Sequence, residues 1–235
     1  MKSINQIRKI SIWIFIIPVV ALNLCLLISV NHELFEGTIF QVGAIGKIGF
    51  TIPYVDGIVS ISRTARTYPA YLIFKPAMIF TAILLIKYWI ANNKLIVTVN
   101  GEDDKRKYFL IFGVGSALFL ITHSIFLGIK FDHDLYKFFR RFVILGFIIF
   151  EIVAQTLLVI NIFKVKEKME RLINKKILIL KIILVIILII TALVAIPFLS
   201  SSGYPRFKHA LEWNYFIGVV FFYLLSFLFW KKVLS

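Results

Sequence analysis

Acidic residues and cysteine are scarce in this chain, which carries 12 Asp and Glu against 27 Lys and Arg and a single cysteine. Cys25 cannot form an internal disulfide, and its place inside an apolar run makes it a small packing residue. The formal net charge of +15 would suit nucleic acid as a partner. The cations mainly flank apolar runs, however, where they meet lipid head groups, so we expect no nucleic-acid binding.

The sequence also lacks the short motifs of common nucleotide and catalytic sites. It contains no glycine-rich phosphate loop, no Gly-x-Ser-x-Gly turn and no His-Glu-x-x-His pair. Gly113 and Gly115 stand inside an apolar run, where they allow helices to approach closely rather than bind a nucleotide. The sequence has no arginine ladder, which would indicate a voltage sensor. It also has no matched pair of interrupted runs, which would indicate an inverted-repeat transporter. We therefore predict no cofactor and leave catalysis undecided, with a non-catalytic role favoured.

Apolar residues are abundant instead, at 60% of the 235 residues and a mean hydropathy of +0.91. A helix that crosses a bilayer needs about 20 mostly apolar residues, and it satisfies its own backbone hydrogen bonds. The sequence predicts an all-α integral membrane protein, with six transmembrane helices in one bundle and one domain over residues 1–235. The predicted spans are about Ile10–Val30, Ala70–Ile90, Tyr108–Ile129, Phe142–Phe163, Ile177–Leu199 and Trp213–Trp230.

The basic residues predict an orientation in the membrane. The two chain ends and the connections after the second and fourth runs carry 16 Lys and Arg, whereas the other connections carry ten over longer loops. This bias places both termini in the cytoplasm and the longest connection, Asn31–Pro69, on the non-cytoplasmic side. We expect a multi-pass protein of the endomembranes (ER, Golgi or lysosome) in a eukaryote, or of the inner or plasma membrane in a prokaryote.

Several polar residues on the non-cytoplasmic side are candidates for contact with a lipid head group. Arg63 and Arg66 lie directly before the second run, and guanidinium groups match phosphate oxygens. His209 and Glu212 open the last run, and His133 lies between the third and fourth runs. Simple anchoring of the arginines at the membrane interface stays open as the alternative.

A few polar residues lie at membrane depth, where ionisable groups usually point into the bundle. His123 and Glu151 are predicted to pair across neighbouring helices, either as an acid and base or as an interior contact for a lipid head group. Glu151 also shares a helix face with Gln155. A structural hydrogen bond that fixes helix packing is the alternative for this pair. Lys181, close to the cytoplasmic surface, is expected to extend its amine toward water.

Asp132, His133 and Asp134 resemble a metal-ligand cluster. Three adjacent residues cannot all reach one ion without ligands from elsewhere, and His209 and Glu212 on the same side would have to supply them. Solvated loop charges are the default interpretation of this stretch. We therefore predict no metal site.

These features together resemble the six-span FRAG/DRAM/SFK-type membrane proteins, which include autophagy modulators and a lumenal lipid-remodelling factor for GPI-anchored proteins. The likeness rests on the six-span topology with a long first loop, on Glu212-Trp213 at the last run, and on the Asp- and His-bearing loop 132–134. This sequence differs from the family pattern at Arg63, where the family usually carries an acidic residue. The approach to the second run adds a proline, serine and threonine pattern at Pro53, Ser60, Ser62, Thr64, Thr67, Pro69 and Phe74.

The resemblance implies a protein that handles or helps to remodel lipids at the non-cytoplasmic leaflet, with GPI-anchor lipids as one candidate. Its partners would be membrane lipids and not nucleic acid, and the sequence does not give the oligomeric state. Two alternatives stay open. One is an intramembrane lipid-modifying enzyme that uses His123 and Glu151, and the other is a small transporter or membrane scaffold without catalysis.

Overall fold

The computed structural model describes residues 2–100, 108–129, 134–200 and 203–232. Six of its helices are long and apolar enough to cross a membrane, so the prediction of six spanning helices is confirmed by length and composition. The described residues contain no strand, only an isolated bridge between Ile173 and Trp230. The six helices are α1 (Lys2–Val30), α3 (Ala70–Asn100), α4 (Tyr108–Phe126), α5 (Asp134–Val165), α6 (Lys175–Ser200) and α7 (Pro205–Phe229).

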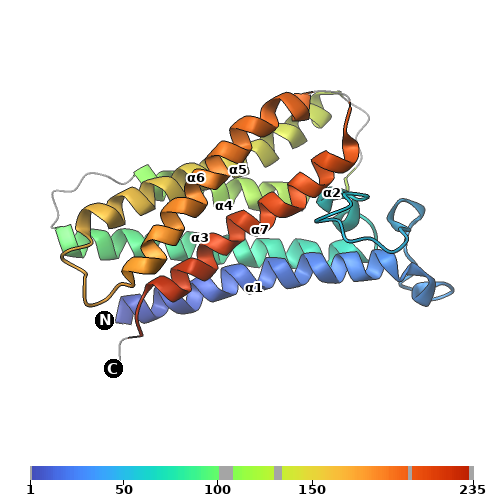
Figure 1. Cartoon of the computed structure of the whole chain (residues 1–235). Coiled ribbons are helices and arrows are strands. Elements are labelled where there is room, and N and C mark those ends of the chain that lie inside the picture. The colour runs from blue at the N-terminus through green and yellow to red at the C-terminus, as the bar shows by residue number, and fades with distance from the viewer. Residues whose placement is uncertain (1, 101–107, 130–133, 201–202, 233–235) are drawn as a thin grey trace.

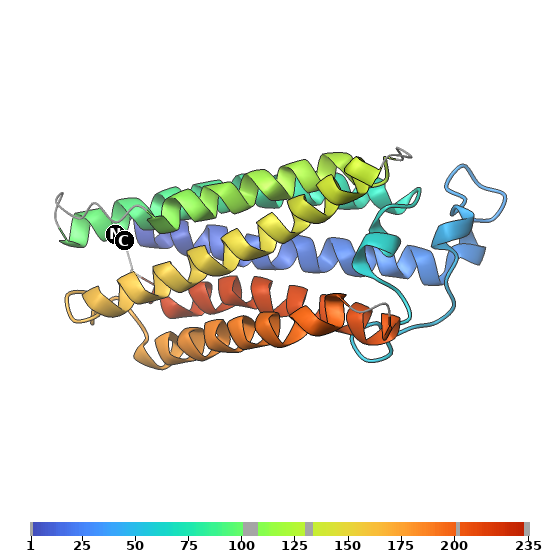
Figure 2. The same cartoon turned by 90° about the horizontal axis from the view of Figure 1, so that it is seen from above.

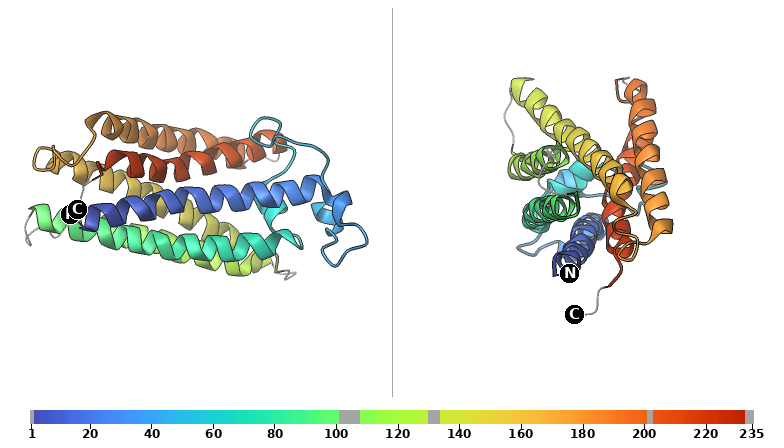
Figure 3. Two further views of the ribbon diagram at one scale, coloured as in Figure 1. Left: turned by 90° about the horizontal axis from the view of Figure 1, so that it is seen from below. Right: turned by 90° about the vertical axis from the view of Figure 1, so that its left-hand side faces the viewer.

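The helices form one bundle in which chain neighbours are mostly neighbours in space (Figure 1). α1 packs against α3 and α7, α4 lies between α3 and α5, and α6 packs against α7. An even number of crossings brings both chain ends to one end of the bundle, as the end-on view in Figure 3 shows. We call this end the terminal end and the opposite one the loop end.

The connection from α1 to α3 lies at the loop end, beyond the end of α1 (Figure 2). It contains two short 3-10 turns, η1 (His32–Phe35) and η2 (Ala44–Gly46), and the five-residue helix α2 (Ile61–Ala65). Ser60 caps α2, because its hydroxyl accepts the backbone N–H of Arg63 over 3.2 Å. The cap fixes the chain just before two predicted site residues, Arg63 and Arg66.

Two glycines let aromatic rings from α3 and α5 pack directly against the α4 backbone. A Cβ on Gly113 would fall within 2.5 Å of the Trp89 ring, and one on Gly115 would fall 2.6 Å from the Phe150 ring. Both positions therefore serve close helix approach, as the sequence predicts. Cys25 is a buried free thiol that donates to the Ala70 carbonyl over 3.3 Å, which fits its predicted packing role.

Candidate functional site

The beginning of α7 holds part of the long loop through side-chain hydrogen bonds to its backbone. We call residues 54–62 the docked segment. The Nδ1–H of His209 donates to the Gly57 carbonyl over 3.0 Å, and the indole N–H of Trp213 donates to the Val59 carbonyl over 2.9 Å. The Trp213 side chain is fully buried beneath the segment. Each bond satisfies a loop carbonyl that has no helix or sheet partner.

Two further α7 side chains hold the two ends of the docked segment. The Glu212 carboxylate faces the backbone N–H groups of Ile61 and Ser62, which are free donors at the start of α2. Asn214 Nδ2 donates to the Tyr54 carbonyl over 2.7 Å. His209 thus bonds to the loop backbone and Glu212 faces it, and contact of either residue with a lipid stays a prediction.

Asp56 folds the docked segment back on the residues before it. Its carboxylate accepts from the Thr51 hydroxyl over 2.7 Å, from the Ile52 N–H over 2.7 Å and from the Ile58 N–H over 3.0 Å. Burial raises the pKa of this carboxyl, but the three donors and the charge of Arg206 outweigh it and leave the pKa below its ordinary value.

We expect acid to loosen this turn. Because the folded pKa is depressed, the stabilisation is fully present above the ordinary value of 3.8 and is lost as the pH falls through the lowered folded value. Hydrogen-exchange protection of the Ile52 and Ile58 amides should fall about threefold across that range, since exposed carboxylates contribute under about 1 kcal/mol. Asp56→Asn should lack the acid-dependent fall, and an unchanged pH profile in this variant would contradict the assignment.

Three arginines gather at the loop end beside the docked segment. Arg63 belongs to α2, Arg66 follows it, and Arg140 comes from α5. Burial, followed by the positive charges of Arg140 and Arg63, lowers the pKa of the half-buried Arg66. No described acid forms an ion pair with any of the three. We call Arg63, Arg66 and Arg140 the arginine cluster.

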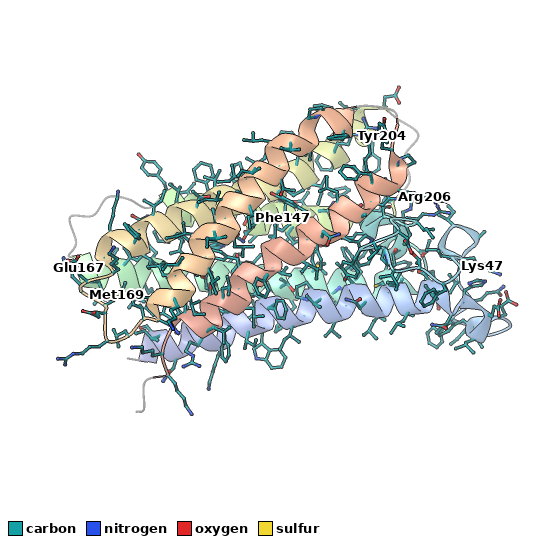
Figure 4. All side chains as sticks on the ribbon, viewed as in Figure 1. Lys47, Phe147, Glu167, Met169, Tyr204 and Arg206 are labelled. Atoms are coloured by element: carbon teal, nitrogen blue, oxygen red, sulfur yellow. The ribbon has the colours of Figure 1, made fainter. Side chains whose placement is uncertain are left out.

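Backbone contacts hold two members of the arginine cluster, Arg63 and Arg66, in place. Arg63 Nε donates to the Ile45 carbonyl over 3.2 Å. The corner after α4 packs against Arg66, since a Cβ on Gly128 would lie 3.0 Å from the Arg66 carbonyl oxygen. The side chain of Arg206 and the Lys47 side chain lie at the same end of the molecule (Figure 4). Lys47 is neutralised there by Glu36 at 2.8 Å, whereas the cluster has no such described partner.

The remaining predicted residues of the loop end are not part of the docked segment. Asp132 and His133 lie outside the described residues, and Asp134 begins α5. His123 lies near the end of α4, half-buried and within electrostatic range of Arg140. It therefore belongs to the surroundings of the arginine cluster rather than to the middle of the bundle.

Glu151 lies fully buried among hydroxyls in the middle of the bundle. Its carboxyl accepts from Ser116 Oγ over 2.6 Å, from Gln155 Nε2 over 3.0 Å and from the Tyr223 hydroxyl. Its partner on α4 is thus Ser116, seven residues or about 10 Å along the helix from His123. The structure does not bring His123 and Glu151 together, and a separate role of either in acid–base chemistry stays a prediction.

The prediction that the Lys181 amine extends toward water is wrong, because the side chain is fully buried. Its amine donates to Ser226 Oγ over 2.8 Å and lies 4.0 Å from the centre of the Phe222 ring. Ser226 Oγ lies 3.0 Å from the Tyr88 hydroxyl. The amine stays inside because α7 supplies both an acceptor and the face of an aromatic ring. Sequence reasoning missed Tyr88, Tyr223 and Ser226, since single hydroxyls are common in spanning helices.

Three of the residues behind the family resemblance have structural roles in this chain: Ser60 caps α2, Trp213 holds the docked segment, and Glu212 faces the start of α2. Scans of protein-family models, curated proteins and solved structures found no match to this chain. Membership of the FRAG/DRAM/SFK-type family stays a prediction.

Proposed function

We propose that this multi-pass membrane protein binds the phosphate head group of a lipid at its loop end and so handles lipids, or helps to remodel them, in that leaflet. The arginine cluster carries the proposal. The positive charges of Arg140 and Arg63 repel that of Arg66, and burial of Arg66 strengthens this repulsion. An anion relieves it, and a phosphate offers several oxygens to guanidinium forks.

The site has the position that a head group requires. Arg66 lies four residues before α3, where a spanning helix begins, and Arg140 lies in the first two turns of α5. Both are therefore near one boundary of the apolar layer. The bias of basic residues puts the terminal end in the cytoplasm, which would make this the non-cytoplasmic leaflet. The family resemblance adds GPI-anchor lipids as one candidate.

The proposal gives the start of α7 a positioning role. Trp213 holds the docked segment and Glu212 faces its end, and the segment runs into α2, which contains Arg63 and is followed by Arg66. A loop fixed in this way loses little further conformational freedom when a ligand binds. We therefore assign Glu212 and His209 to the geometry of the site and the arginines to the head group.

We expect Arg66→Gln and Arg140→Gln each to weaken binding to phosphatidic acid by about tenfold, because each removes a charge-assisted hydrogen bond of about 1.5 kcal/mol or more. The measurement is binding of soluble, short-chain phosphatidic acid to protein in phosphatidylcholine nanodiscs. Arg141→Gln is the matched control. It removes the same charge from the adjacent, exposed residue of α5 and should leave the affinity within twofold of the unchanged protein.

Equal weakening by Arg66→Gln, Arg140→Gln and Arg141→Gln would contradict a defined head-group site and indicate only general surface charge. Phosphatidylcholine of the same chain length should bind to all variants alike, since its head group carries no net charge. Competition by inorganic phosphate at equal affinity would show that the site recognises free phosphate rather than a lipid.

A further inference from the structure

The chain that follows α1 exposes large apolar side chains outside the spanning helices, at the loop end (Figure 2). Ile39 and Phe50 are each 81% exposed, Leu34 is 78% exposed, and Phe40 and Ile45 are exposed as well. We call these five residues the apolar loop surface. Exposed apolar side chains that gather outside a protein core mark contact with a partner or with a membrane. We therefore expect a partner or a membrane to cover this surface.

Charge is nearly absent from this part of the chain. Lys47 is the only charged residue between Gly37 and Val55, and its amine is paired with the Glu36 carboxylate at 2.8 Å. A protein partner held by electrostatic complementarity would need charges on this surface. Apolar side chains without nearby unpaired charge can instead enter the boundary between lipid head groups and acyl chains at little desolvation cost. The composition of the loop therefore favours lipid as its covering.

The end of α1 fixes the depth of the apolar loop surface. The apolar run after Lys9 extends from Ile10 to Val30, and as a helix it rises about 31 Å, which matches the roughly 30 Å of a hydrocarbon core. Val30 therefore lies near the boundary of that core. The backbone N–H of Ile48 donates to the Ser29 carbonyl over 3.2 Å. The loop thus returns to the same boundary just before Phe50.

The start of α3 holds the first half of the surface at a similar level. The Tyr68 hydroxyl donates to the Ile39 carbonyl over 2.7 Å, and the Gly43 N–H donates to the Tyr68 carbonyl over 3.4 Å. Tyr68 lies two residues before α3, and its ring packs against that of Tyr71 with centroids 5.9 Å apart. Tyrosines at the ends of spanning helices are typical of the head-group level. The backbone at Ile39 is therefore held at the membrane interface.

The exposed side of α1 continues into the apolar loop surface. Val20, Leu24 and Leu27 are exposed, and their spacing places them on one side of the helix. The Asn31 N–H donates to the Leu27 carbonyl over 3.0 Å, and the Leu34 N–H donates to the Asn31 carbonyl over 3.1 Å. These bonds extend the helical path beyond α1, so Leu34 follows the exposed side of the helix. Lipid that covers α1 can therefore also cover the start of the surface.

We propose that residues 34–50 form an interfacial anchor, in which the apolar loop surface enters the head-group layer of the membrane that the bundle spans. The occupant is the bilayer itself, because the surface lies at the boundary of the hydrocarbon core, has no unpaired charge and continues the exposed side of a spanning helix. The inference rests on the spans and the loop contacts, and it holds whether or not the arginine cluster binds a phosphate. The anchor also holds Arg63 at this depth, since Arg63 Nε donates to the Ile45 carbonyl over 3.2 Å.

Collision rates of a nitroxide spin label test the anchor in protein reconstituted into phosphatidylcholine nanodiscs. Ile39→Cys and Phe50→Cys each carry the label, and the unchanged protein is the blank, because Cys25 is buried. Oxygen concentrates in lipid, whereas a neutral nickel chelate stays in water. We expect the ratio of oxygen to nickel collisions at both positions to exceed that at Lys168→Cys, an exposed site between α5 and α6, by about tenfold. The ratio should approach that at Leu27→Cys on the exposed side of α1.

The matched control is Glu33→Cys, which places the same label on an exposed, charged residue next to Leu34. Its collision ratio should stay close to that at Lys168→Cys. Equal ratios at positions 33 and 39 would show that the label rather than the native side chain seeks the lipid, and would overturn the anchor. A ratio typical of water at positions 39 and 50 would also overturn it. Protection from both oxygen and nickel there would do the same, because it would indicate a protein partner such as a second copy of this chain.

Discussion

Gly57→Ala should release the docked segment from α7. Gly57 has a φ of +57°, which costs a residue with a side chain about 1–2 kcal/mol. The added Cβ would also fall 2.6 Å from the Arg206 carbonyl carbon and closer still to its oxygen, and a helix backbone cannot give way. The loop must therefore move. Hydrogen-exchange mass spectrometry should show at least tenfold faster exchange across residues 54–62, with the protection of α1 and α3 unchanged.

Gly37→Ala is the matched control for this prediction. Gly37 has a φ of +73°, so the substitution brings similar backbone strain, but a Cβ there would meet no atom within 4 Å. Exchange over residues 54–62 should stay as in the unchanged protein. Under the proposed function, Gly57→Ala should also weaken phosphatidic acid binding, because Arg63 and Arg66 follow the segment. Full protection of residues 54–62 in Gly57→Ala would contradict the docking.

The bundle could be predicted from the sequence because lipid leaves few alternatives to a long apolar helix. The helix ends were less predictable. The predicted fourth span begins at Phe142, whereas α5 begins at Asp134 and includes Arg140 and Arg141. Charged residues with long side chains support a helix well, and nothing in their composition marks where the helix leaves the lipid. Hydropathy locates the apolar centre of a span rather than the ends of the helix.

The candidate site was only partly predictable, because its residues meet across elements that are far apart in the chain. Arg63 and Arg66 are predictable from their position before a span, but Arg140 joins the cluster only because α5 packs against α4 and brings its first turns to the loop end. Glu212 is recognisable as an acid at the start of a span, but no sequence pattern indicates that its carboxylate faces the first N–H groups of α2.

Lys181 shows the same limit inside the bundle. A lysine six residues into an apolar helix can reach the surface, and that is its ordinary behaviour. Its actual direction depends on which face of α6 packs against α7 and on Ser226 and Phe222 at the contact. α6 is apolar nearly all round, so its sequence has no periodicity from which the buried face could be recognised.

Gly113→Ala should destabilise the bundle by about 2 kcal/mol and lower the unfolding temperature in detergent by about 5 °C. The new Cβ would lie 2.5 Å from Trp89 Cε2 and closer still to two other atoms of that ring. Trp89 cannot move aside easily, because it is fully buried and in contact with Tyr88, Tyr223 and Phe109. The helix propensity of alanine opposes the loss by only about 1 kcal/mol.

Gly218→Ala on α7 separates this packing effect from helix propensity. Its Cβ would also fall close to a neighbour, at 2.9 Å, but that atom is Leu188 Cδ2, the far end of a flexible side chain. A small rotation of the leucine removes the contact, so the gain in helix propensity should dominate and the unfolding temperature should stay level or rise slightly. The two glycine-to-alanine changes are thus expected to act in opposite directions. Equal shifts in Gly113→Ala and Gly218→Ala would show that the Trp89 ring does not set the distance between α3 and α4.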